Sequence, residues 1–224
     1  MHRRDFLRGA VTAAPVIAVV AGQPQPAAAQ EMAGLALPRP QLQGGRPLMQ
    51  ALSDRKTTRT ISEEKLSPQM LSNLLWAAWG VNRPANNGRT APSANNAQEI
   101  SVYVFLEQGV YLFDEKAHNL KPVAAGDHRT AAGAQPGVAK APVNLVYVAD
   151  LDKYRAGQAA ESKLAFSNAH AGFIGQNVYL FAASEGLASW FRASVDAPAV
   201  AQLLSLRPGQ KVLYGQTVGY PAKG

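Results

Sequence analysis

The chain has 224 residues, of which 47% are hydrophobic, so it contains enough apolar material for one well-buried core and little more. It contains no cysteine, which excludes disulfides, thiolate metal sites, iron–sulfur clusters and a cysteine nucleophile. The formal net charge of +7 would suit an anionic partner, but the basic residues are scattered and not interleaved with aromatic residues, so we expect a solvated basic surface with one local anion site and no nucleic-acid binding.

The first 29 residues have the parts of a cleaved export signal. A charged start containing Arg3-Arg4 precedes an uncharged stretch over residues 9–22, and Ala27-Ala28-Ala29 offers a small-residue cleavage site. The paired arginines followed by Phe-Leu resemble a twin-arginine signal. Because the apolar stretch is shorter than the ~20 residues that span a bilayer, we expect no stable membrane anchor. Residues 1–29 therefore predict a periplasmic or otherwise exported protein, which crosses the membrane folded around an organic cofactor.

Residues 30–45 contain prolines and glycines without a periodic apolar pattern, which predicts a flexible tether. No internal repeat or second linker follows, so we expect one domain over residues 46–224. Its first clear helix begins at Ser67-Pro68, because Ser is a favourable N-cap and Pro a favourable first helical residue. Gly80 stands where a C-terminal cap belongs. The apolar positions between them recur at helical spacing and are Leu71, Leu74, Leu75 and Ala78.

Strands and helices alternate along the rest of the chain. Residues 100–106 and 110–114 predict a hairpin across Gln108-Gly109, and residues 143–149 are apolar enough for a central strand. A long helix is expected over residues 160–184, ended by Gly186. The later elements are two strands and a short helix, over residues 188–194, 211–218 and 198–204. Because the hairpin rules out a purely parallel doubly wound sheet, we predict an α+β fold with one central mixed or antiparallel sheet packed by helices.

The first candidate site is the basic stretch from Arg55 to Arg59. Arg55, Lys56 and Arg59 with the hydroxyl of Thr57 could clamp a phosphate, since guanidinium groups donate in pairs to phosphate oxygens. The alternative is a solvated basic loop, which spacing alone favours.

The second candidate site precedes the first predicted strand of the hairpin. Pro92, Ser93, Ala94 and Asn96 lie in a segment whose small residues permit close backbone approach and whose polar residues both donate and accept hydrogen bonds. A planar heterocycle with carbonyls and ring nitrogens needs that mixture. A polar turn with a helix cap is the alternative.

The third candidate site is the strand that follows the long helix. It carries Arg192 and Ala193 near its end, where an apolar strand with one positive residue could lie behind a planar ring. Taken alone, the strand is better explained as part of the core.

Together and in this order, these segments resemble the FMN-dependent nitroreductase family, and most closely its branch related to the dehydrogenases that oxidise thiazoline and oxazoline rings in peptides. Residues 55–59 are similar to the family's R-x-S-x-R opening, with Thr57 in place of Ser. Residues 92–98 are similar to its P-S-x-x-N-x-Q segment, and residues 170–177 with 185–189 to its long dimer helix and the following turn. Gly219-Tyr220-Pro221 is typical of its C-terminal end.

The resemblance implies a nitroreductase-like fold, a homodimer with the long helix at its interface, and bound FMN. In the family the basic opening holds the flavin phosphate and ribityl chain, the second segment lies along the flavin, and the third presents a backbone N–H to flavin N5. Lys223 is the one cation left beyond Gly-Tyr-Pro, where the family completes its phosphate site. The implied cofactor-binding residues are Arg55, Lys56, Thr57, Arg59, Pro92, Ser93, Ala94, Asn96, Arg192, Ala193 and Lys223.

The implied activity is a ping-pong oxidoreduction in which an electron donor and a small organic substrate react in turn at flavin N5, with no catalytic residue on the protein. NAD(P)H is not expected outside the cytoplasm, so the electron partner of an exported enzyme is left open. A non-catalytic exported flavin- or ligand-binding protein and a dehydrogenase acting on peptide-derived heterocycles are the alternatives. We expect no metal site, since His118, His128 and His170 are too widely spaced to form one along a helix.

Overall fold

The computed structural model describes residues Met32–Lys223. Their main feature is a seven-stranded sheet with the order β1-β6-β5-β4-β7-β9-β8, in which every neighbouring pair is antiparallel. The strands of this sheet are β1 (Leu35–Ala36), β4 (Ile100–Leu106), β5 (Gly109–Asp114), β6 (Asn119–Ala125), β7 (Val143–Asp150), β8 (Ala188–Arg192) and β9 (Gln210–Gly219). A separate two-stranded ribbon is formed by β2 (Val81–Arg83) and β3 (Gly88–Arg89). The predicted export signal lies outside the described residues and stays a prediction.

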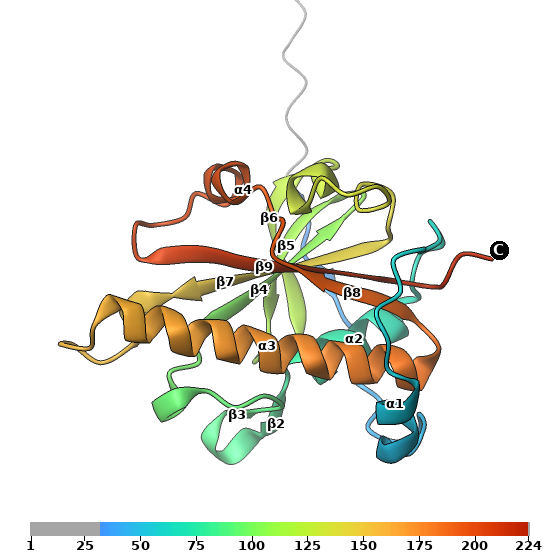
Figure 1. Cartoon of the computed structure of the whole chain (residues 1–224), viewed down its shortest axis with the longest axis horizontal. Helices are drawn as coiled ribbons and strands as arrows, with labels where there is room; N and C mark the ends of the chain where they lie inside the picture. The colour runs from blue at the N-terminus through green and yellow to red at the C-terminus, as the bar shows by residue number, and fades with distance from the viewer. Residues whose placement is uncertain (1–31, 224) are drawn as a thin grey trace, which may run out of the picture. The chain divides into compact units, whose positions relative to one another are not determined.

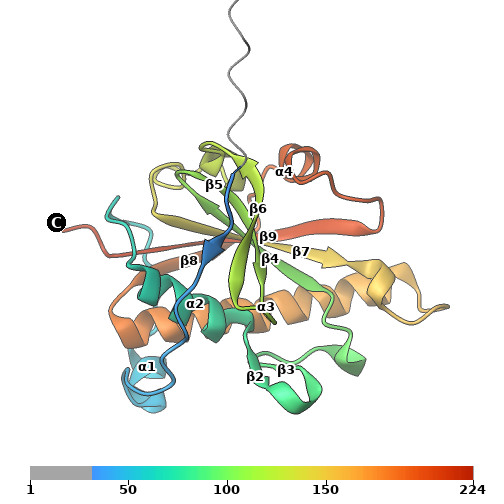
Figure 2. The same cartoon turned by 180° about the vertical axis from the view of Figure 1, so that it is seen from behind.

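The helices lie on both sides of this sheet (Figure 1 and Figure 2). They are α1 (Leu48–Asp54), α2 (Pro68–Trp79), α3 (Ala160–Glu185) and α4 (Ala197–Leu203). The first three lie on one side, where α3 runs the width of the sheet, and α4 lies on the other. The predicted α+β architecture with an antiparallel sheet and one long helix is therefore confirmed. No helix between Met32 and Lys223 is long and apolar enough to cross a membrane.

Successive side chains of the central strands point to alternate faces of the sheet, so a hydrophobic core forms on each face. In β4, Val102 and Val104 point toward α2 and α3, whereas Tyr103 and Phe105 point to the opposite face. The core beneath the helices also contains Ile174 of α3. Because both faces are covered, β7 consists entirely of buried residues, as its apolar sequence predicts.

The helix boundaries follow the capping residues. The Ser67 side chain accepts a hydrogen bond from the Met70 N–H at 3.1 Å, and α2 stops at Gly80. α3 ends at Gly186, which has the left-handed conformation that glycine adopts without steric cost.

Two strands of the sheet were not expected from the sequence. β1 falls within the expected tether, where it pairs with β6, and the chain just after it is held by a bond from Ser72 Oγ to the Pro38 carbonyl at 2.6 Å. A two-residue strand is too short to show a period. β6 contains Pro122, which disfavours a strand, and its ladder with β5 shifts register.

Candidate functional site

The basic stretch 55–59 continues from the end of α1 and is tied to β8. The Thr58 N–H donates to the Ser189 carbonyl at 3.0 Å. Asp54, the one acid beside the stretch, is bound by Gln50 at 2.9 Å and by Arg46 at 2.6 Å, and these two bonds lower its pKa. The acid is thus already paired, and the three cations form no ion pair with any described residue.

Alternate residues of this stretch point to different places. The Arg55 guanidinium lies 5.3 Å from the ring centroid of Tyr179 on α3, and Thr57 Oγ1 lies 3.0 Å from the Tyr179 hydroxyl. That hydroxyl also accepts the Phe191 N–H at 2.7 Å, so it links the basic stretch to β8. Lys56 and Thr58 instead line a hollow of about 540 Å³ beside the C-terminal end of α3. Tyr179 was not singled out from the sequence, since nothing local distinguishes it from a helix tyrosine.

The end of the chain returns to the same place. An isolated antiparallel bridge joins Ile61 to Pro221, and the Ala222 N–H donates to the Thr60 carbonyl at 3.1 Å. Continued by one more pair, this register puts Lys223 opposite Arg59. The structure therefore adds the fourth predicted cation to the basic stretch, although the two are separated by more than 160 positions in the chain.

The segment 92–98 is folded around its own side chains. Ser93 Oγ accepts the Gln98 N–H at 3.0 Å, and the Gln98 amide donates to the Asn87 carbonyl and to Asn96 Oδ1, each at 2.8 Å. Pro92 and Asn96 are exposed, while Ser93 and Ala94 are partly covered. The Ala94 N–H donates to Nε2 of His170 on α3 at 2.9 Å.

Arg192 faces away from α3. Alternate residues of β8 point to opposite sides, and Phe191 packs toward Gly175 of α3, so Arg192 enters the other core. There it is 7% exposed and donates to Thr217 Oγ1, the Ala132 carbonyl and Asn144 Oδ1. Burial lowers its pKa to about 10. Its side chain is a structural cation, so only the backbone here and at the exposed Ala193 can contribute to a site.

The basic stretch and the segment 92–98 do not meet within one copy of the chain. The first contacts α3 at Tyr179 and the second at His170. These residues are nine positions apart, which in an α-helix corresponds to about 13 Å along the axis and to a half-turn around it. The resemblance described under Sequence analysis implies that both segments lie along one bound flavin. A single copy of the chain does not bring them together.

The outer surface of α3 and the neighbouring α1 exposes large apolar side chains. Phe173 is 46% exposed and Met49 is 75% exposed. The full set is Leu48, Met49 and Leu52 on α1 with Leu164, Phe166 and Phe173 on α3; we call it the outer apolar face. An unpartnered face of this kind is typical of a protein–protein interface.

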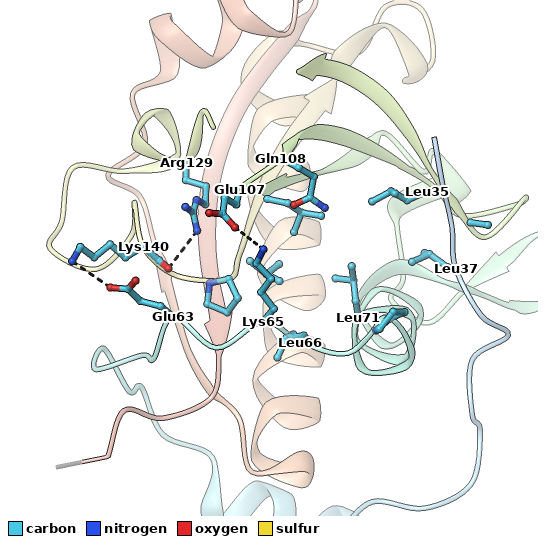
Figure 3. Close-up of a pocket in the computed structure, with 15 residues that line it drawn as sticks. Leu35, Leu37, Glu63, Lys65, Leu66, Leu71, Glu107, Gln108, Arg129 and Lys140 are labelled. Atoms are coloured by element: carbon cyan, nitrogen blue, oxygen red, sulfur yellow. Dashed lines mark hydrogen bonds and ion pairs between the residues drawn. The ribbon is translucent and has the colours of Figure 1, made fainter. Parts of the chain in front are cut away.

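A separate pocket of about 350 Å³ lies at the turn between β4 and β5, and none of the predicted site residues lines it (Figure 3). Leu37, Leu66 and Leu71 are among its apolar walls. Its charged groups are all paired: Lys65 with Glu107 at 2.6 Å, Lys140 with Glu63 at 3.2 Å, and Arg129 with Asp127 outside the pocket at 2.7 Å. The pocket therefore offers no free charge to a ligand.

Comparison with known proteins gives a consistent result. A family model described as "Nitroreductase family" matches residues 52–220. A candidate nitroreductase of Methanocaldococcus jannaschii is 28% identical over 150 residues, which cover 62% of this chain and 75% of that protein. The crystal structure of a candidate nitroreductase from Ralstonia eutropha is 37% identical, with a TM-score of 0.81 over 90% of this chain and 96% of the other. The microcin synthetase McbBCD complex of Escherichia coli, with truncated pro-MccB17 bound, matches at 21% identity and a TM-score of 0.66, over 75% of this chain and 70% of the other.

Proposed function

Because the chain belongs to the nitroreductase family, we propose that it is an FMN-dependent oxidoreductase that exchanges electrons between a donor and a small organic substrate. Bound FMN would supply the hydride and electron chemistry at its N5 atom, so no nucleophile or general base is required of the protein. The chain's own residues would bind the phosphate, orient the ring and hold the two substrates in turn.

The observation that carries this proposal is the basic stretch with its unpaired cations. Arg55, Lys56 and Arg59 lie within five residues, and the C-terminal pairing brings Lys223 opposite Arg59; none of the four forms an ion pair with a described residue, and the neighbouring Asp54 is held by Arg46. Arg55 and Thr57 lie together at Tyr179 and offer a guanidinium group and a hydroxyl that suit a phosphate dianion; Arg59 and Lys223 would add positive charge there, whereas Lys56 lines the hollow beside α3. A solvated basic loop would not need Tyr179 to hold Thr57 and Arg55 in place.

We also propose that a second copy of the chain completes the site. The basic stretch and the segment 92–98 lie at opposite sides of α3, so one protomer can supply the phosphate contacts and its partner the contacts along the ring. The outer apolar face lies along the same helix and offers the surface on which the two copies would pack.

We expect the protein to be a homodimer in light scattering, and Phe173→Glu to shift it toward the monomer. A carboxylate in the centre of the outer apolar face would have to be buried unpaired. Val123→Glu is the matched control, because Val123 is similarly exposed but lies on β6, away from α3. A wild-type monomer that still holds one FMN per chain would contradict the proposed assembly.

We expect protein purified without added flavin to be yellow and to release FMN, and not FAD, on heating. FMN has one terminal phosphate, which one cluster of cations can bind. The basic stretch from Arg55 to Arg59 is such a cluster among the described residues. The measurement is the visible spectrum followed by chromatography of the released cofactor. A colourless protein whose addition does not quench FMN fluorescence would refute FMN binding.

The same purified protein can be used to test whether it is an enzyme or a non-catalytic binding protein. Photoreduced or dithionite-reduced flavin that is reoxidised by a small acceptor, such as a quinone or a nitroaromatic compound, supports the enzyme. Bound flavin that no donor or acceptor turns over favours a non-catalytic binding protein. The likeness to the microcin synthetase complex is a likeness of fold alone, so a peptide-derived heterocycle is one acceptor class to test among others.

A further inference from the structure

The segment 92–98 has an unusual backbone. Three of its last four residues, Asn95, Asn96 and Gln98, have φ values of 52°, 54° and 47°. Asparagine tolerates this left-handed region, whereas glutamine adopts it rarely. Such a conformation persists only where surrounding contacts hold it, and clusters of this kind are common at ligand-binding sites. The contacts that hold this segment are therefore of functional interest.

The single bond from this segment to α3 is made by His170. Its Nε2 accepts the Ala94 N–H at 2.9 Å, and the His170 side chain is 4% exposed. The rings of Phe166 and Phe173, one turn before and after, each lie 6.2 Å from the imidazole centroid and limit its rotation. The donor is the third residue of the segment, directly before the residues with positive φ.

Glu99 determines which nitrogen of His170 can accept this bond. Nδ1 lies 2.7 Å from Glu99 Oε1, and the Glu99 side chain is fully buried. The Ala94 N–H can only donate, so Nε2 must carry a lone pair and the proton of the neutral ring must be on Nδ1. Nδ1 then donates to the Glu99 carboxylate. The Tyr154 hydroxyl lies farther from Nδ1, at 3.5 Å, and the other carboxylate oxygen, Oε2, has no hydrogen-bond partner among the described residues.

We propose that His170, held in one tautomer by Glu99, is a positioning residue that fixes the segment 92–98 in the conformation in which it meets the flavin. The inference rests on the proposed function for the identity of the ligand. The effect is indirect: His170 is buried, and it acts through the backbone of Ala94.

The test compares two variants of the full-length protein. His170→Asn keeps an amide donor near the position of Nδ1 but has no acceptor at the position of Nε2, whereas His170→Gln can place an amide oxygen there. We expect the dissociation constant for FMN to rise roughly tenfold in the Asn variant and to stay within about threefold of the wild type in the Gln variant. The thermal midpoints of both apo-variants are measured as the control, since a purely structural role would lower both without separating their affinities.

Amide hydrogen exchange of residues 93–98 in the flavin-free protein gives an independent readout. We expect faster exchange at Ala94 in the Asn variant, with protection largely restored in the Gln variant. Unchanged affinity and unchanged exchange in the Asn variant would overturn the inference. If the wild type binds no FMN, the proposed function fails, and the exchange measurement alone then decides whether His170 holds the segment.

Discussion

Arg55→Ala and Arg59→Ala are each expected to weaken FMN binding by roughly ten- to a hundredfold. Each guanidinium would make charge-assisted hydrogen bonds to a phosphate dianion in a partly desolvated site, and one such contact contributes about 1.5–3 kcal/mol. Lys substitutions should recover only part of the loss, because an ammonium group cannot donate the paired bonds of a guanidinium. The measurement is an FMN titration at fixed ionic strength.

Two controls distinguish a lost phosphate contact from a general loss of positive charge or of stability. Lys121→Ala removes one positive charge from β6, near the other edge of the sheet, and is expected to leave FMN affinity unchanged. The unfolding midpoints of the flavin-free variants should stay close to that of the wild type, since neither arginine belongs to the core. If both Ala variants bind FMN as tightly as the wild type, the phosphate lies elsewhere and the likeness of residues 55–59 to the family motif is accidental.

Gly175→Ala is expected to lower the free energy of unfolding by about 1–3 kcal/mol through overpacking. A Cβ at Gly175 would lie 2.6 Å from the Phe191 ring, which itself stacks on Tyr147, packs at a tilt against Tyr214 and has little room to move. The Gly175 carbonyl also accepts a bond from the buried Gln216 amide at 3.1 Å, which keeps this part of α3 against β9. Urea unfolding at one protein concentration measures the loss.

Gly172→Ala is the matched control on the same helix. A Cβ at Gly172 meets no atom of the protomer within 4 Å, and replacing a mid-helix glycine by alanine adds roughly 0.5–1 kcal/mol of stability. Gly172 lies beside Phe173 on the outer surface of α3, so any effect through dimerisation would vary with protein concentration, whereas the Gly175 effect would not. Equal stability of the two variants would show that Phe191 moves aside without cost. Partial recovery by adding Phe191→Leu to Gly175→Ala would confirm the contact.

The sequence by itself indicated most of the long elements and several of their ends, but not β1 or β6. Ser67, Gly80 and Gly186 mark helix boundaries because caps act on backbone groups within a few residues. The apolar run of β7 predicts a strand covered on both faces, because its residues alternate between two buried sides. The order of the basic stretch, the segment 92–98 and the strand after the long helix was sufficient to indicate the family, since that order does not depend on how the elements pack.

Only the tertiary structure decided how these segments relate to one another. It turned the Arg192 side chain into the core, brought Lys223 opposite Arg59, and placed the basic stretch and the segment 92–98 on opposite sides of α3. It also joined His170 to Ala94, although the sequence had suggested no role for this histidine. These relations join residues that are from 76 to more than 160 positions apart, or depend on which face of a strand is covered. They are set by the pairing of strands and the packing of helices, and no local pattern of residues encodes them.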